Sequence, residues 1–267
     1  MILGDDRAQL SGTSSYGEVT NDVGADGLWR RRKSSVLRET FRLEGAHIFS
    51  DRWQVGFSVP IMRQSYHGQS SSGLGDLVGV IGYEALPVWD FSPWRPRGHV
   101  FLQVTAPGGS PSPQDSEADY QLDSHGRGFY SLGAGAIFTK VVGRWDISAS
   151  LDIHRSLPKN FKNSQTNGRV TPGYGGNLGI GGGWNLQRLR LGLLLIWTYE
   201  DPLVIDGEIS SVGAAERFAT ARISTTYLFP AEWSVIAAVS DQTWIGNPVN
   251  TSLGQDVTVS LRKTWMR

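Results

Sequence analysis

Three polar residues near the middle of the chain, Asp152, His154 and Ser156, have the types and the spacing for acid–base or nucleophilic chemistry. A hydroxyl nucleophile needs a base within hydrogen-bond reach, and residues two positions apart in a β-strand lie on the same face. The apolar Leu151 and Ile153 take the opposite face. Asp152, His154 and Ser156 are therefore the residues on which a hydrolytic activity of this chain would depend.

A second group of chemically capable residues is acidic. Asp115, Glu117, Asp119 and Asp123 supply oxygen atoms of the kind that bind Ca²⁺, but without the regular spacing of a dedicated loop, so we interpret this segment as a solvated external loop. The alternating glycines of 179–183 follow no strand-to-helix transition, so they do not form a phosphate-binding loop. We expect no metal site and no cofactor.

The elements that carry these residues are β-strands, because apolar and other residues alternate along the chain with a period of two. The clearest instance is 189–199, where one face carries only Leu189, Leu191, Leu193, Leu195, Trp197 and Tyr199. Similar patterns predict about twelve strands, at 8–20 (a weak pattern), 35–49, 53–63, 74–85, 99–106, 129–140, 145–157, 175–186, 189–199, 218–229, 233–245 and 256–265.

The connections between these strands are alternately short and long. Tight turns are expected at 50–52, 141–144, 187–188 and 230–232, and long polar loops at 21–33, 64–73, 107–128, 158–174, 200–216 and 246–255, with a medium segment at 87–98 in a short position. Outer-membrane barrels have this asymmetry, with short periplasmic turns and long external loops. We therefore expect an all-β fold, a single 12-stranded antiparallel transmembrane barrel over 1–267 with both termini on the periplasmic side, the segment 1–20 being the weakest part.

Aromatic residues gather at the strand ends. Two girdles around an aliphatic band fit the two water–lipid interfaces of a membrane, whereas a soluble barrel of this width would be hard to fill with aliphatic side chains. The expected membrane-interface residues are Trp53, Trp145, Trp184, Trp197, Tyr199, Tyr227, Trp233 and Trp265.

The opposite face of each strand then lines the lumen. The residues expected there are Arg38, Arg42, Asp76, Glu84, His99, Phe101, Gln103, Asp146, Asp152, His154, Arg222 and Arg262. After closure the four arginines fall on one arc of the wall and the four carboxylates on the other. This leaves two readings open: a transverse field across a pore, or ion pairs that meet in the lumen and plug it.

Composition excludes several classes. Lys+Arg and Asp+Glu balance at 25 each, so no net field favours nucleic acid. No apolar stretch approaches the length of a transmembrane helix, and the opening Met1 to Asp6 is too short for a signal peptide. We interpret the chain as a mature sequence with an added or retained Met. The absence of cysteine says little about the compartment.

Several short segments of the predicted strands and turns carry a resemblance to known proteins: Phe41-Arg42-Leu43-Glu44, the stretch 51–60, Gly73-Leu74-Gly75-Asp76-Leu77, the stretch 101–109 and the stretch 128–133. They resemble the bacterial outer-membrane proteins labelled "MetA-pathway of phenol degradation", or putative transporters. The resemblance implies a barrel of about this strand number with a transport role, and no catalytic or ligand residues. Such barrels commonly end in an aromatic residue, whereas this chain ends in Trp265-Met266-Arg267.

Two weaker resemblances are enzymatic. His154-Arg155-Ser156 resembles the His-x-Ser pair of outer-membrane phospholipases, which faces lipid, whereas here the pair has lumen parity. Asp152-Ile153-His154 resembles the Asp-x-His pair of omptin proteases, which needs a second acidic pair that the sequence does not clearly supply. The sequence therefore favours a barrel without catalytic activity and leaves an enzyme as an open alternative.

We expect a porin-like barrel in the outer membrane of a Gram-negative bacterium that passes small solutes passively or by facilitated diffusion. Apolar residues of lumen parity make hydrophobic or aromatic solutes an option: Phe101, Phe129, Leu194, Ile196 and Ile236. The alternatives are a non-transporting barrel whose external loops bind a partner or surface, and an outer-membrane hydrolase centred on Asp152 and His154. The expected partners are membrane lipid, lipopolysaccharide and a small solute, but no nucleic acid, and we expect a monomer.

Overall fold

The computed structural model of the chain describes residues 1–2, 6–87, 94–109, 116, 118–162, 167–207 and 210–266. Apart from one 3₁₀ turn, η1 (Asp119–Gln121), the regular structure in these ranges is β-strand. Within the same ranges, no helix is long and apolar enough to cross a membrane.

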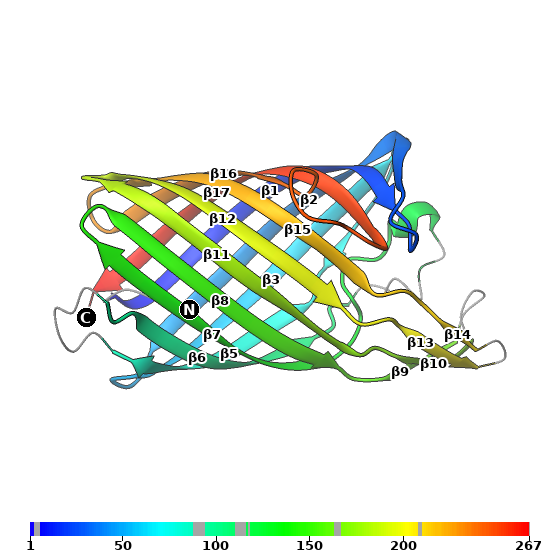
Figure 1. Cartoon of the computed structure of the whole chain (residues 1–267), viewed down its shortest axis with the longest axis horizontal. Coiled ribbons are helices and arrows are strands. Elements are labelled where there is room, and N and C mark those ends of the chain that lie inside the picture. Colours follow the sequence, from blue (N-terminus) through cyan, green and yellow to red (C-terminus); the bar gives the residue numbers. More distant parts are fainter. Residues whose placement is uncertain are drawn as a thin grey trace.

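The strands of the wall form a closed antiparallel barrel of 12 strands, as the alternation predicted (Figure 1). Around the wall they are β1 (Asp6–Val23), β2 (Trp29–Ile48), β3 (Trp53–Tyr66), β5 (Leu77–Leu86), β6 (Arg97–Ala106), β7 (Ser131–Val142), β8 (Trp145–Ser156), β11 (Tyr174–Leu186), β12 (Leu189–Glu200), β15 (Glu216–Leu228), β16 (Trp233–Asp241) and β17 (Thr251–Met266). Each pairs with its neighbours in chain order.

The barrel closes where the two ends of the chain meet, between β1 and β17. The register pairs Asp6 with Met266 and Val23 with Thr251, so the seam runs the whole length of both strands. Two hydroxyl hydrogen bonds reinforce it: Thr13 Oγ1 donates to Ser260 Oγ at 2.9 Å, and Ser15 Oγ lies 3.0 Å from Thr258 Oγ1. Closure leaves no unpaired edge in the wall, as a sheet in lipid requires.

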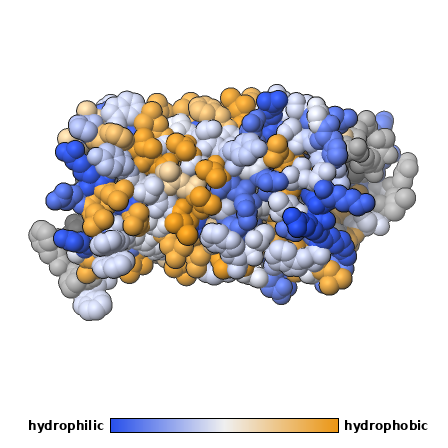
Figure 2. Space-filling model, turned by 90° about the horizontal axis from the view of Figure 1, so that it is seen from above, coloured by the Kyte–Doolittle hydropathy of each residue, from blue (hydrophilic) through white to orange (hydrophobic). Residues whose placement is uncertain are grey.

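The two faces of the wall differ in polarity. Along β8, Ile147, Leu151 and Ile153 are exposed on the outside, whereas Asp152 and His154 alternate with them and are half-buried inside. An apolar belt is visible around the middle of the molecule, with hydrophilic surface towards both ends (Figure 2). Outward apolar and inward polar parity is the arrangement of a barrel in lipid.

The two ends of the barrel are unequal. The turns at 49–52, 143–144, 187–188 and 229–232 are short and lie with the C-terminus at one end, and longer segments lie at the other end (Figure 1). β1 and β2 extend further than predicted: the segment 21–33, expected as a loop, is strand except for 24–28. Continued pairing of β1 with β2, Asp22 with Arg30 for example, carries the sheet past the apolar belt.

The strand predicted at 74–85 is observed as β5, whereas most of the segment 64–73, expected as a loop, is strand, because β3 continues to Tyr66 and a short strand follows it. β4 (Gln69–Leu74) pairs with the upper part of β3, and β5 pairs with its lower part. Pro60 lies where β3 changes partner, and its carbonyl accepts a hydrogen bond from Gly75 N at 2.9 Å. The missing N–H of proline costs least at such a change of partner. Asp76 lies between β4 and β5.

The predicted loops at 158–174 and 200–216 also contain strands. β9 (Lys159–Lys162), β10 (Asn167–Thr171), β13 (Val204–Gly207) and β14 (Ser211–Val212) form a separate four-stranded sheet beyond the wall (Figure 1). Phe129, Phe161 and Val170 are buried together beneath Leu203 and Ile205. These isolated apolar residues meet only after the loops fold against each other, so no local pattern revealed them.

Candidate functional site

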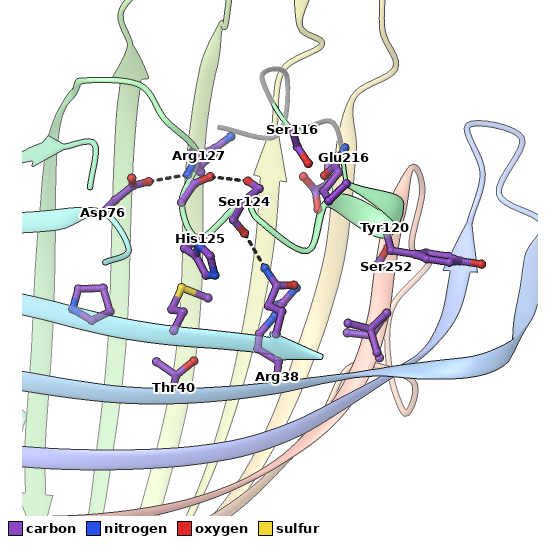
Figure 3. A pocket seen from close by; sticks show the side chains of 18 of the residues that line it. Arg38, Thr40, Asp76, Ser116, Tyr120, Ser124, His125, Arg127, Glu216 and Ser252 are labelled. Carbon is purple, nitrogen blue, oxygen red and sulfur yellow. Dashed lines mark hydrogen bonds between the residues drawn. The ribbon is translucent and has the colours of Figure 1, made fainter. Parts of the chain in front are cut away.

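The half of the lumen at the end with the longer connections is called the outer half below. The connection between β6 and β7 folds into this half and narrows it. In its described part, Leu122 packs against Val19 and Val36, and His125 is only 2% exposed. Figure 3 shows His125 and Ser124 above the side chains of Arg38 and Thr40. This inward segment, residues 118–130, is called the inner loop below.

Asp76 anchors the inner loop. Its Oδ2 accepts a hydrogen bond from Arg127 N at 2.7 Å (Figure 3), and its Oδ1 accepts one from Gly108 N at 3.3 Å. A Cβ on Gly126 would overlap this carboxylate, so the close approach requires glycine there. On the other side of the loop, Gln64 Nε2 donates to Ser124 O at 2.5 Å.

Below and beside the inner loop, the lumen holds three adjoining cavities. The outer cavity measures about 950 Å³, the middle one about 290 Å³ and the inner one about 540 Å³. Arg42 lines all three, and Arg38 and Thr40 line both the outer and the middle cavity. The three cavities therefore adjoin at Arg42, and the outer and inner cavities also share Pro60 and Asp76.

The other end of the lumen is narrowed by Ile2. Its backbone N–H donates to Gln54 Oε1 at 2.7 Å, and Gln54 Nε2 donates to Ile2 O at 3.2 Å. Both residues are buried. Met1, beside them, reaches Gly82 of β5 and lines the inner cavity. The lumen is thus narrowed by a segment of the chain on each side of the cavities.

The lumen arginines have no carboxylate partner. Arg38 and Arg42 of β2, Arg222 of β15 and Arg262 of β17 make no ion pair or side-chain hydrogen bond with any residue that the structure describes. Arg38 and Arg42 are nevertheless exposed to the lumen, and Arg262 Nε is buried without a partner. Their guanidinium donors remain available to water or to a solute.

The carboxylates across the lumen are satisfied locally. Glu84 accepts from Arg97 Nε at 2.5 Å, and Asp146 accepts from Arg190 at 2.6 and 2.8 Å. Asp152 accepts from Asn177 Nδ2 at 3.2 Å. Within the described ranges these acids do not reach the opposite arginines, so the plug of ion pairs across the lumen is not formed.

Asp152, His154 and Ser156 lie in one row but do not assemble for catalysis. Asp152 Oδ1 is 3.9 Å from His154 Nδ1, too far for a hydrogen bond. His154 Nε2 lies 3.1 Å from both Glu200 Oε1 and Arg127 Nη1, and Arg127 also donates to Glu200 at 2.5 Å. Ser156 is buried and makes no side-chain hydrogen bond to His154. The histidine is held in a network rather than beside a nucleophile.

Other expected lumen residues lie against the wall. His99 is buried with Nδ1 unpartnered, Gln103 lies over Gly133, and the Phe101 ring lies over Gly135. The glycines of the lumen face are thus covered by side chains of neighbouring strands. Phe129, expected to line the lumen, is instead buried against Phe161 and Val170 of the projecting sheet.

The aromatic residues expected at the membrane interfaces are all exposed on the outside of the structure. They are Trp53, Trp145, Trp184, Trp197, Tyr199, Tyr227, Trp233 and Trp265. Trp145 and Trp184 stack with ring centroids 6.3 Å apart.

The acidic segment falls partly outside the described residues, which include neither Asp115 nor Glu117. Within the described part, Ser116 Oγ donates to Asp123. Among the described residues, no group of three or more histidine or acidic side chains is placed to hold a metal ion.

Sequence reasoning missed the residues that shape the lumen from a distance. Arg127 and Gln64 hold the inner loop, and Arg190 crosses Gly183 to reach Asp146. Each of these contacts joins residues 44 or more positions apart in the chain. A period-two pattern reports which face a residue takes but not which partner it finds.

No protein-family model matches the sequence, and the comparison with curated proteins finds no match. Solved structures do match. An outer membrane channel from Pseudomonas putida F1 superposes with a TM-score of 0.78 at 15% identity, covering 99% of this chain and 97% of that one. A deletion mutant of TodX, a monoaromatic hydrocarbon channel of Pseudomonas putida, gives 0.52 at 10% identity, covering 99% and 92%.

The β domain of the Bordetella autotransporter BrkA matches similarly, with a TM-score of 0.52 at 12% identity over 97% of this chain and 100% of that domain. These likenesses show the fold: the chain has the fold of bacterial outer-membrane β-barrels. They confirm the barrel that the resemblance to putative transporters implied.

Proposed function

We propose that the chain forms a passage for small solutes across the bacterial outer membrane. The observation that carries this proposal is the set of three cavities that adjoin at Arg42 inside a closed wall. A water molecule occupies about 30 Å³ of liquid volume, so even the middle cavity has room for several. The likeness to a structure named an outer membrane channel supports the same function.

The solutes are small and partly apolar. Leu194 and Ile196 face inward on β12, Pro60 and Met62 line the outer cavity, and polar groups alternate with them. One of the matching structures is named a monoaromatic hydrocarbon channel, which supports aromatic solutes as the substrate class. The inner loop sets access from outside, because it covers the outer cavity.

The same architecture supports a monomer surrounded by lipid. Trp197 and Tyr199 at one strand end, and Trp145 and Trp233 at the other, form the two interface belts of this proposal. The exposed Arg217, whose neighbour in the register is Tyr199, is positioned to contact lipopolysaccharide phosphates. A closed wall needs no partner to satisfy its edges, which favours a monomer.

The test is conductance of the purified, folded chain in planar bilayers. Thr40 faces two cavities, whereas the adjacent Phe41 is exposed outside. Thr40→Trp should reduce single-channel conductance, and Phe41→Trp should leave it unchanged. The shift in electrophoretic mobility on heating checks that both variants fold. No current from the folded wild type, or equal effects of the two variants, would contradict a passage through the lumen.

The projecting sheet supports a second function, binding of a partner at the cell surface. Val204 of β13 and Val212 of β14 are exposed on this sheet, 40% and 70% respectively, beyond the apolar belt. Replacing both with Ser should weaken attachment of the folded protein to host or bacterial surfaces and leave conductance unchanged. Equal attachment of the variant and the wild type would rule out this face.

A further inference from the structure

We infer that the junction of the outer and middle cavities binds the carboxylate of a small organic anion with an apolar body. This inference rests on the proposed function and specifies its substrate class. The binding groups are the guanidinium groups of Arg38, Arg42 and Arg222, and the apolar contact is made by Pro60 and Met62.

Three arginines converge on one cavity. Arg38, Arg42 and Arg222 all line the middle cavity, which also contains two acids, Glu18 and Asp256. Asp256 lies in the same row of the register as Arg38 and Arg222, through Gly17 and Ser240, yet makes no ion pair with either. With three positive and two negative side chains, the cavity has an excess of one positive charge, which suits a monoanion.

The donors in this cavity are unused. A guanidinium group presents five N–H donors in a planar fork that matches the two oxygens of a carboxylate. Arg190 shows this geometry within the same lumen, where its Nε and Nη2 bind the two oxygens of Asp146 at 2.8 and 2.6 Å. Arg38, Arg42 and Arg222 have no such partner among the described residues. A solute carboxylate would supply the missing partner.

An apolar strip runs directly beside these arginines. On the adjacent strand β3, Pro60 pairs with Arg42 and Met62 pairs with Thr40, and both side chains line the outer cavity. Ile196 of β12, the strand next to the one that carries Arg222, also lines the middle cavity. A carboxylate bound at Arg38 and Arg42 would therefore place an attached ring or short aliphatic chain against Met62, whose sulfur favours aromatic contact.

The charge balance separates this substrate class from others. A cation would be repelled by the arginines, and a neutral aromatic solute would leave their donors unmatched. A phosphate dianion would find only one net positive charge in the cavity. Acetate has the carboxylate but lacks the apolar body, so it should bind more weakly than an anion that has both.

The binding test is calorimetric titration of the folded barrel in detergent micelles with benzoate, benzyl alcohol, acetate and inorganic phosphate, at about 0.1 M salt, where screening extends over about 10 Å. Benzoate should bind most tightly. The double variant Arg38→Gln/Arg42→Gln should weaken benzoate binding roughly tenfold or more, as expected for lost hydrogen bonds between charged groups. Arg155→Gln is the matched control, since Arg155 is exposed on the outside against the Tyr174 ring; it should leave binding unchanged.

A second measurement separates this inference from the proposed function. The reversal potential across a bilayer with a KCl gradient should show chloride preferred over potassium, and the double variant should lose that preference. Conductance without anion preference and without benzoate binding would overturn the inference while keeping the passage. Benzoate binding without conductance would overturn the passage while keeping the anion site. Equal binding of benzoate and benzyl alcohol would also overturn the inference.

Discussion

The charged side chains of the lumen differ in how they are satisfied. Glu84 finds its arginine partner on the adjacent strand, and Asp76 accepts two backbone N–H groups. Arg38 and Arg42, in contrast, have no acidic residue beside them on the two adjacent strands. The residues paired with them there are Thr13, Gly17, Pro60 and Gln64. The local partners of the acids leave these arginines with an uncompensated charge. At the scale of the residue, the side of the lumen that carries Arg38 and Arg42 therefore has positive charge that the acids on the opposite side do not neutralise.

Asp76→Asn should loosen the inner loop. The carboxylate makes two charge-assisted hydrogen bonds to the backbone N–H groups of Arg127 and Gly108, and an amide oxygen can replace them only in part. Hydrogen bonds to charged groups contribute about 1.5–3 kcal/mol each. We expect larger and noisier single-channel currents. Asp256→Asn removes the same charge from the lumen without touching the inner loop and should leave the current noise unchanged; noise equal in both variants would refute the anchoring role.

His154→Ala tests the hydrolase hypothesis. Because His154 Nε2 lies against Glu200 and Arg127 rather than Ser156, we expect the wild-type protein to release no product from phospholipid or peptide substrates. The variant should then be indistinguishable from the wild type in these assays. Hydrolysis by the wild-type protein that is lost in His154→Ala would support the hydrolase hypothesis instead.

At the scale of the element, the strands keep flat lumen faces by pairing glycine with larger neighbours. The Phe101 ring of β6 lies over Gly135 of β7, and Gln103 lies over Gly133 two positions away. A side chain laid against the wall in this way leaves the centre of the lumen open. The glycines thus preserve the width of the passage indirectly, by making room for side chains on the next strand.

Gly135→Ala should destabilise the barrel. An added Cβ would lie 2.5 Å from the backbone oxygen of Leu151 and would overlap the Phe101 ring, and only the ring can move away cheaply. Overpacking of this kind costs about 1–3 kcal/mol. Gly79→Ala is the control, because a Cβ there meets nothing within 4 Å. Urea unfolding in lipid vesicles should show a lower midpoint for Gly135→Ala alone.

The sequence predicted the strands well and the lumen contacts poorly. The alternation along 189–199 needs only the chain itself to define two faces, so β12 was found with an error of one residue. The anchoring of Arg127 by Asp76, in contrast, joins positions 51 residues apart. The sheet formed by β9, β10, β13 and β14 depends on Phe161 and Ile205 meeting across two loops. Such contacts arise only from the closed barrel, which brings distant segments to one rim.

At the scale of the whole molecule, the wall has one face suited to hydrocarbon, on the outside, and one suited to water, on the inside. Leu193, in the central part of β12, is 51% exposed on the outside, and the adjacent Leu194 faces the lumen. The apolar belt in Figure 2 requires hydrocarbon around it, whereas the cavities require water within. Of two adjacent residues in one strand, the outward one should therefore be apolar, whereas the inward one can be polar or charged.

Leu193→Arg should impair folding into vesicles far more than Leu194→Arg. A lipid-facing arginine near the membrane midplane costs about 2–4 kcal/mol, whereas an arginine in a water-filled lumen keeps its hydration. The fraction of folded protein after dilution from urea into lipid vesicles measures the difference. Equal loss in the two variants would mean that the inner face is as dry as the outer one.

The seam between β1 and β17 also dictates the order of events during folding. Thr13 and Ser260 are 247 positions apart, so their hydrogen bond forms only after nearly the whole chain has been gathered into a curved sheet. Contacts between such distant positions are slow to form, because the intervening chain must first lose its freedom. Until the seam closes, β1 and β17 each carry a row of unpaired backbone groups that can pair with another chain. Closure of the seam pairs every strand of the finished barrel. Before that step, the two unpaired edge strands make the unclosed sheet prone to aggregation.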